Sequence, residues 1–191
     1  MYHCKNYTDT MDIVKKLFKS KSSISICPFY NIKEEYRVIY LKGECLVIYS
    51  KQRPYVIGNG INNIDELMIK YREELSEYIT IDKVEDVDLS YIPKENEKVF
   101  LTWKHNLYNG AIPKVVEDEI KIKQLSDFAK NVAKVIGIDF ATIDIIELED
   151  ENYMVLEVNS GVGMTIFSKN VDNGYQIAKD IYSKAIDELF K

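Results

Sequence analysis

Apolar positions recur every three or four residues in four separate segments of this chain. In the longest, they lie on one face from Ile120 to Ile136 and stop at Gly137, which is typical of a helix closed by glycine. Asn63, with Glu66 three residues later, forms a capping-box pattern at the start of another. The spacing predicts four amphipathic helices, over residues 8–19, 63–75, 120–136 and 175–190.

Between these segments, β-branched and aromatic residues gather in short runs that are typical of strands. Lys42-Gly43-Glu44 folds one run into a hairpin, and residues 82–97 are polar and irregular. The runs predict strands over residues 23–29, 36–49, 99–102 and 143–159, the second and last of these being hairpins. Hairpins with helices packed on one face indicate an α+β fold with an antiparallel sheet, not a doubly wound parallel sheet.

The last hairpin carries two carboxylates and an amide inside otherwise apolar strands. Residues 149–152 form a polar turn, and a hairpin symmetric about this turn places Asp144 directly opposite Glu157. Asn159 lies two residues beyond Glu157 and therefore shares its face of the strand. Opposed carboxylates repel each other, whereas a divalent cation would attract both. The pattern predicts an oxygen-rich patch suited to Mg²⁺ or Mn²⁺.

The hairpin pattern leaves an alternative open. A solvated hairpin face that is simply acidic would show the same spacing of charges as a metal site. A one-residue bulge would also break the pairing of Asp144 with Glu157. The spacing alone does not separate these interpretations.

Composition narrows the function classes. The chain has 191 residues, 46% of them hydrophobic, which is enough for one core and a small appendage. A net charge of −6 without a Lys/Arg cluster argues against a nucleic-acid partner. Cys4, Cys27 and Cys45 are widely spaced, which fits reduced thiols better than disulfides or a zinc site. Since the sequence shows neither a signal region nor a run of about 18 apolar residues, we expect a cytoplasmic protein without a membrane partner.

Four blocks follow one another between Ser22 and Met164, and their order is more specific than any one of them. They are Cys27-Pro28-Phe29-Tyr30 with Glu35-Tyr36-Arg37-Val38; Ile57-Gly58-Asn59-Gly60 with Ile64-Asp65-Glu66-Leu67; Trp103-Lys104-His105-Asn106-Leu107-Tyr108-Asn109-Gly110; and Gly137-Ile138-Asp139-Phe140-Ala141 with Asp144 and Glu157-Val158-Asn159. Together these blocks resemble the carboxylate-amine ligase branch of the ATP-grasp superfamily, in particular its cyanophycin-synthetase-like and glutamate-ligase-like members.

The resemblance implies a site for ATP and a divalent metal. Asp144, Glu157 and Asn159 would hold one or two Mg²⁺ or Mn²⁺ ions that bridge the phosphates of ATP. The backbone of Pro28 to Tyr30 would hydrogen-bond adenine. Glu35 would hold the ribose hydroxyls, its alternative being a solvated charge at a strand end.

The resemblance also points to four cations that would neutralise phosphate: Arg37, Lys51, Arg53 and Lys104. Arginine suits bidentate contact with phosphate or carboxylate, and lysine a point contact. Each would otherwise be an ordinary surface charge. Asn106 would contact the phosphoryl or acyl-phosphate group, its alternative being a turn residue before Asn109-Gly110. His105 is interpreted as a packing or surface residue rather than a base.

The chemistry implied by the family is phosphoryl transfer followed by acyl transfer. A small-molecule carboxylate attacks the γ-phosphate of ATP, and a small-molecule amine then displaces phosphate from the acyl phosphate to form an amide. No side-chain nucleophile is needed. This agrees with a sequence that has no convincing Ser/His/Asp or Cys/His arrangement.

Full-length members of this branch carry a substrate domain and a lid subdomain before the first block. We therefore expect residues 1–22 to be a remnant of the lid and 23–191 the nucleotide- and metal-binding domain, with the missing lobe on a longer chain or a separate subunit. The isolated chain is expected to be inactive, and a homodimer remains open. Val162-Gly163, Thr102 and Asn59 stand where relatives have Pro-Gly, Arg and Asp, which leaves the substrates undefined. The alternative function is a degenerate domain that binds a nucleotide or partner without ligating.

Overall fold

The computed structural model describes residues 2–70 and 79–190, and the chain divides into two compact units, residues 1–31 and 32–191. The N-terminal unit contains one helix, α1 (Tyr7–Leu17). Its N-terminus is capped by Asn6, whose side-chain oxygen accepts a hydrogen bond from the backbone N–H of Asp9 at 2.9 Å. The helix predicted from residues 8–19 is thus confirmed.

Residues 23–29 form no strand, so that prediction was wrong. Ile26 and Cys27 are exposed in this segment, and no described strand pairs with it. An apolar run becomes a strand only where a neighbouring strand satisfies its backbone N–H and C=O groups. Cys4, Cys27 and Cys45 are free thiols in this structure.

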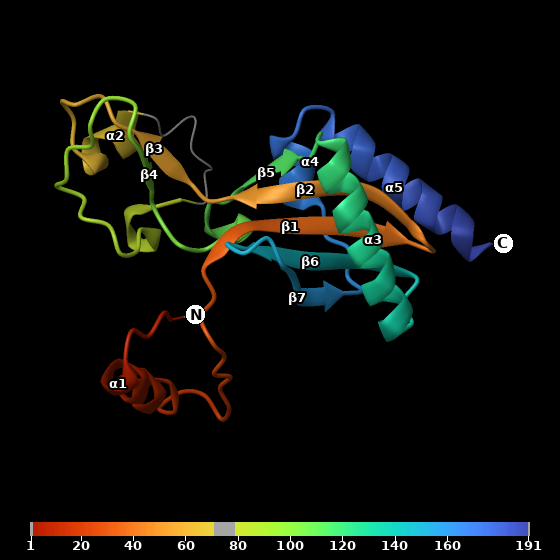
Figure 1. The fold of residues 1–191 in the computed structure, drawn as a ribbon, viewed down its shortest axis with the longest axis horizontal. Helices are drawn as coiled ribbons and strands as arrows, with labels where there is room; N and C mark the ends of the chain where they lie inside the picture. The colour runs from red at the N-terminus through yellow and green to blue at the C-terminus, as the bar shows by residue number, and fades with distance from the viewer. Residues whose placement is uncertain (1, 71–78, 191) are drawn as a thin grey trace. The chain divides into compact units, whose positions relative to one another are not determined.

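The larger unit is built on a five-stranded antiparallel sheet with the order β5-β2-β1-β6-β7 (Figure 1). The strands are β1 (Ile32–Leu41), β2 (Glu44–Gln52), β5 (Ile112–Val115), β6 (Phe140–Leu148) and β7 (Tyr153–Asn159). Lys42 and Gly43 join β1 to β2 with positive φ angles of 42° and 89°, the turn geometry that matches strand twist. The predicted antiparallel α+β fold is confirmed.

Helices cover both faces of this sheet, which corrects the expectation of a single covered face. On one face α3 (Glu119–Ile136) packs Leu125 and Ala129 against the sheet, and Figure 1 shows this helix crossing in front of the strands. On the other face lie α4 (Thr165–Asn170) and α5 (Gly174–Leu189), with Phe167 and Ile181 in the core. Helical periodicity identifies the apolar side of a helix but not the face of the sheet on which it packs.

A smaller sheet pairs β3 (Tyr55–Ile57) with β4 (Lys98–Phe100) and shares a separate apolar core with α2 (Ile64–Lys70). The capping box of α2 is confirmed, since the side chain of Asn63 accepts from the N–H of Glu66 at 2.9 Å and that of Glu66 accepts from Asn63 at 3.0 Å. The rest of the predicted helix, residues 71–78, lies outside the described residues. β3 and β5 were not predicted, because strands of three and four residues carry little periodicity.

Two one-turn 3₁₀ helices complete the described elements, at Ile81–Lys83 and Leu107–Asn109. The strand predicted over residues 99–102 begins and ends earlier, as β4. Within the described residues, no helix combines the length and the apolar character that crossing a membrane requires.

Gly58, between β3 and α2, leads to a stability prediction. A Cβ atom at this position would lie 2.1 Å from the carbonyl oxygen of Lys94 and 2.7 Å from the Cβ of Pro93. We therefore expect Gly58→Ala to lower the free energy of unfolding, measured in urea, by about 3 kcal/mol, the upper end for overpacking. Gly161→Ala is the matched control, because a Cβ there meets nothing within 4 Å, and should change it by less than about 0.5 kcal/mol. Equal losses of stability in the two variants would contradict the close packing of Gly58 against Pro93 and Lys94.

Candidate functional site

Charged side chains line up across the central strands of the large sheet. One register row contains Tyr49 of β2, Arg37 of β1, Asp144 of β6 and Glu157 of β7. Tyr49 belongs to the core formed with α4 and α5, so this row faces those helices rather than α3. The predicted opposition of Asp144 and Glu157 is confirmed.

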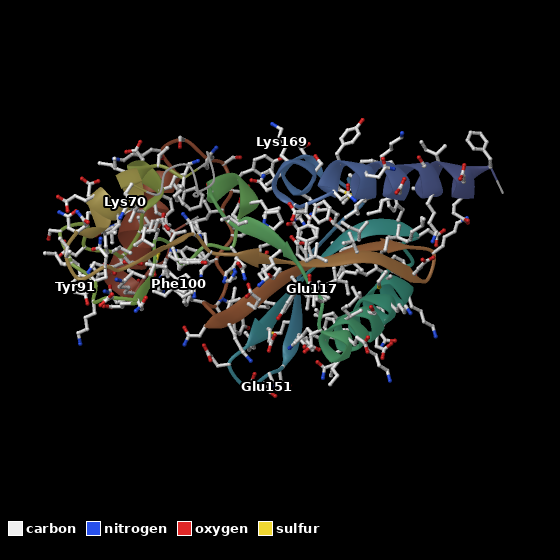
Figure 2. The ribbon with its side chains drawn as sticks, turned by 90° about the horizontal axis from the view of Figure 1, so that it is seen from above. Lys70, Tyr91, Phe100, Glu117, Glu151 and Lys169 are labelled. Carbon is white, nitrogen blue, oxygen red and sulfur yellow. The ribbon has the colours of Figure 1, made fainter. Side chains whose placement is uncertain are left out.

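The pairing of Asp144 with Glu157 depends on two irregularities that offset each other. The turn is a three-residue loop in which Leu148 and Asn152 are hydrogen-bonded and Glu151, at the hairpin tip in Figure 2, has a φ of 64°. Below the turn, Ile145 pairs with Val155, so the register is shifted by one residue from a symmetric hairpin. A bulge after Val155 restores the pairing at Asp144. The expected bulge therefore creates this register rather than breaking it.

Asp144 is held by two cations. Arg37 donates to both carboxylate oxygens, from Nε to Oδ1 and from Nη2 to Oδ2, each at 2.7 Å. Lys51 Nζ donates to Oδ2 at 2.6 Å and also to the carboxylate of Glu35. Asp144, Lys51 and Glu35 are all buried. We call these four residues the Asp144 cluster.

In the Asp144 cluster, the cations and burial have opposite effects on the pKa of the carboxylates. Burial alone would raise the pKa of Asp144, but the hydrogen bonds and charges of Arg37 and Lys51 outweigh it and hold the pKa below its ordinary value. For Glu35 burial prevails over the attraction of Lys51, and the pKa is raised. Asp144 is consequently the carboxylate of the pair that is ionised most readily.

Glu157 and Asn159 are the other two predicted metal donors. Neither Glu157 nor Asn159 has a side-chain hydrogen bond or ion pair with a described residue, and Glu157 is exposed. Asn159 pairs with Thr142, two residues from Asp144 and on the same face of the sheet. Residues 2–70 and 79–190 hold no group of three or more His, Cys, Asp and Glu side chains suited to a metal. Two carboxylates and one amide still form a hard oxygen donor set that fits Mg²⁺ or Mn²⁺.

Arg53 differs from the other predicted cations because no described carboxylate pairs with it. Its guanidinium lies over the ring of Phe100, with Cζ 3.9 Å from the ring centroid. Burial lowers its pKa, and the negative charge of Glu34 only partly opposes this. An arginine without a carboxylate partner can donate its N–H groups to an anionic ligand.

Lys104 and Asn106 are engaged elsewhere. Lys104 Nζ contacts Glu85 Oε1 at 2.6 Å. The side-chain oxygen of Asn106 accepts from the N–H of Tyr108 at 2.8 Å and caps the second 3₁₀ helix. The turn interpretation of Asn106 is thus observed. Among the contacts of the described residues, neither side chain bonds to the Asp144 cluster, so a role on phosphate stays a prediction.

The segment predicted to contact adenine lies in the N-terminal unit. Phe29 and Tyr30 are exposed there, and the ring of Phe29 stacks on His3 with centroids 3.6 Å apart. The contribution of Pro28 to Tyr30 through backbone groups stays a prediction.

His105 is more closely tied to the site than the sequence indicated. The side chain is buried, and Nδ1 lies 2.9 Å from the carbonyl oxygen of Lys51, so this nitrogen carries the proton and donates it. Burial lowers the pKa of His105 to about 4, helped by the charges of Arg53 and Lys51. His105 is therefore neutral at pH 7 and fixes the backbone of Lys51.

The lowered pKa of His105 predicts a pH-dependent stability. The unfolded chain takes up a proton on this residue below about pH 6.5, whereas the folded chain resists until about pH 4. The contribution is complete above pH 6.5 and is lost as the pH falls toward 4, by up to about 3 kcal/mol. Urea unfolding at pH 7, 6, 5 and 4 should show a steeper loss for the wild type than for His105→Gln. Parallel curves would contradict this assignment.

Strand β6 carries a second buried carboxylate, Glu147, on its opposite face. Glu147 accepts hydrogen bonds at 2.9 Å from the Tyr36 hydroxyl, Lys33 Nζ and Lys121 Nζ. Lys121 belongs to α3 and also donates to the hydroxyl of Tyr153. In the sequence, only the alternation of side chains along β6 indicates that Glu147 lies on the opposite face from Asp144, since residues three apart in a strand point to opposite faces.

Comparison with known proteins finds that the chain is similar to ATP-grasp ligases. Residues 93–185 match the family model of the RimK-like ATP-grasp domain. Cyanophycin synthetase of Geminocystis herdmanii is 25% identical over 193 residues, which cover 90% of this chain and 22% of that protein. The glutathione biosynthesis bifunctional protein of Clostridium perfringens is 30% identical over 181 residues, 83% of this chain and 22% of that protein. The chain thus spans less than a quarter of the length of these curated relatives.

Solved structures show the same fold. The D-alanine–D-alanine ligase of Bacillus anthracis, crystallised with ATP, superimposes with a TM-score of 0.55 at 17% identity and covers 95% of this chain and 46% of its own. The bifunctional glutathione synthetase of Pasteurella multocida gives a TM-score of 0.54 at 18% identity, covering 81% of this chain and 24% of its own.

Proposed function

We propose that this chain, an ATP-grasp protein of the carboxylate-amine ligase-like type, is the nucleotide- and metal-binding part of an ATP-dependent ligase that joins a carboxylate to an amine. The observation that supports this most is the row of Arg37, Asp144 and Glu157 on one face of the sheet. Such a row presents hard anionic donors and a guanidinium side by side, as a metal-bound phosphate requires. The free thiols support a cytoplasmic location.

In this proposal, Asp144, Glu157 and Asn159 hold Mg²⁺ or Mn²⁺, which neutralises charge on the phosphates of ATP. Arg37 and Lys51 orient Asp144 and lie beside the phosphates. Their present contacts with carboxylates support a role in balancing charge rather than in proton transfer.

Arg53, Lys104 and Asn106 are proposed to contact the group in transfer. Arg53 is supported by its guanidinium, which has no ion pair with a described carboxylate and can donate to two oxygens of a phosphoryl or acyl-phosphate group. Glu35 was assigned to ribose. Its burial and its contact with Lys51 favour an additional role in fixing that lysine.

The proposed reaction has two steps. An oxygen of the substrate carboxylate forms a bond to the γ-phosphorus of ATP and ADP leaves, which gives an acyl phosphate. The nitrogen of the amine then bonds to the acyl carbon, phosphate leaves with the bonding electrons, and the amine loses a proton. The described residues supply charge and position in both steps.

The second candidate is a binding domain that no longer ligates. It is favoured by the complete set of protein partners around Asp144, which makes the site self-sufficient without a ligand. The two candidates differ in that only a ligase would release ADP in a way that depends on the acid and the amine substrates.

Release of ADP tests the proposal. The chain is combined with the N-terminal lobe that the family resemblance implies, and ADP is measured with a panel of carboxylates and amines. We expect ADP release to require Mg²⁺ and one carboxylate, and a suitable amine to raise its steady rate. ATP binding without any substrate-dependent ADP release would support the binding domain instead.

A further inference from the structure

The predicted metal donors differ in whether they already have hydrogen-bond partners in the metal-free protein. Glu157 and Asn159 have no side-chain partner among the described residues, whereas both oxygens of Asp144 accept hydrogen bonds from cations. A metal ion that binds this set must therefore share Asp144 with a cation of the protein or replace one.

Arg37 and Lys51 are not equivalent in this respect. Arg37 grips Asp144 with two parallel hydrogen bonds of 2.7 Å from a neighbouring position in the strand register, and Asp144 is its one ion-pair partner among the described residues. Lys51 makes a single bond to Asp144 and has a second carboxylate, Glu35, within reach. Losing Asp144 would leave the half-buried Arg37 without an ion-pair partner among the described residues, whereas Lys51 would stay paired with Glu35.

We propose that Lys51 occupies the cation position of Asp144 in the metal-free protein and that a divalent metal ion displaces it, while Arg37 stays bound. This inference rests on the metal site of the proposed function. After displacement the ammonium remains on Glu35, and the N–H that had donated to Asp144 is released beside the face where phosphate would lie. The exchange replaces one positive charge by two, so the buried carboxylate is never left without a cation.

The exchange predicts that removing Lys51 strengthens metal binding. Two ligands that compete for one group weaken each other's binding by the same factor. Lys51→Met keeps the length of the side chain but removes the charge, and leaves Oδ2 of Asp144 without the lysine. We expect Mn²⁺, titrated into the full chain and followed by electron paramagnetic resonance, to bind about tenfold or more tightly to this variant than to the wild type.

Lys121→Met is the matched control. Lys121 likewise donates to a buried carboxylate of β6, but that carboxylate is Glu147 on the opposite face. Its Mn²⁺ affinity should stay within about twofold of the wild type. Equal strengthening in both variants would show a general effect of net charge and would overturn the exchange.

Chemical labelling of the wild type supplies a test without substitution, which holds even if Lys51→Met fails to fold. Lys51 is 4% exposed and shared by two carboxylates, so acetic anhydride should acetylate it slowly. Saturating Mn²⁺ should raise acetylation of Lys51, read by mass spectrometry, and leave Lys121 unchanged. No change at Lys51 in metal-saturated protein would overturn the proposal.

The outcomes also separate this inference from the proposed function. If the wild type and both variants fail to bind millimolar Mn²⁺, the metal site itself is wrong and the exchange falls with it. If the wild type binds Mn²⁺ and Lys51→Met binds it equally or less tightly, the metal site stands and the exchange alone is refuted.

Discussion

Asp144→Asn is expected to lower the free energy of unfolding in metal-free buffer by about 3 to 5 kcal/mol, the usual cost of removing one partner from a buried ion pair. Arg37 and Lys51 would lose the charge that compensates their burial, and Glu35 could neutralise only Lys51. Urea denaturation followed by circular dichroism gives the value directly.

Glu157→Gln is the matched control for this substitution. Glu157 is the register partner of Asp144 on the neighbouring strand, but its side chain is exposed and has no partner among the described residues. Its replacement should change stability by less than about 0.5 kcal/mol. A loss below about 1 kcal/mol for Asp144→Asn would mean that Asp144 is not the charge that holds the cluster together.

Arg53→Ala and Lys104→Ala should each lower turnover about 100-fold or more in a preparation that also contains the preceding lobe. Groups that stabilise charge developing in the transition state have effects of this size on kcat, with little effect on ATP binding. Glu35→Ala should instead raise the KM for ATP if it holds the ribose, because a contact present equally in both states changes binding only. Steady-state ADP release, measured with and without amine, gives the turnover and the KM for ATP of all three variants.

Arg53 is the more informative of the two cations. Lys104 is balanced by Glu85, whereas Arg53 has an aromatic ring in place of a described carboxylate. Silent substitutions at both positions would rule out the roles proposed for them. Equal ADP release whatever carboxylates and amines are supplied would rule out the ligase mechanism.

The sequence was sufficient to predict the helix caps and the turn, for which the signal lies within a few neighbouring residues. The capping box at Asn63, the glycine stop at Gly137 and the β1–β2 turn all involve contacts within a few residues, and each is confirmed. The strand predicted at 23–29 failed because a strand also needs a partner, which a local pattern does not reveal.

The candidate site shows the same division. The opposition of Asp144 and Glu157 was predicted from a symmetric hairpin, yet it arises from a shortened turn and a bulge whose offsets cancel. The cations around Asp144 come from β1 and β2, more than 90 residues away in sequence, so spacing could not connect them to it. His105 gave no signal of its own, because its burial and its bond to Lys51 exist only in the folded chain.

Calorimetric titration of Mn²⁺ tests the central claim, that Asp144 and Glu157 form a metal site on one face of the sheet, most directly. The wild type is compared with the double variant Asp144→Asn/Glu157→Gln and with Glu147→Gln, which alters a buried carboxylate of the same strand on the opposite face. We predict that the wild type and Glu147→Gln bind Mn²⁺ with the same affinity and that the double variant shows no binding. Equal Mn²⁺ binding by the wild type and the folded double variant would contradict the account.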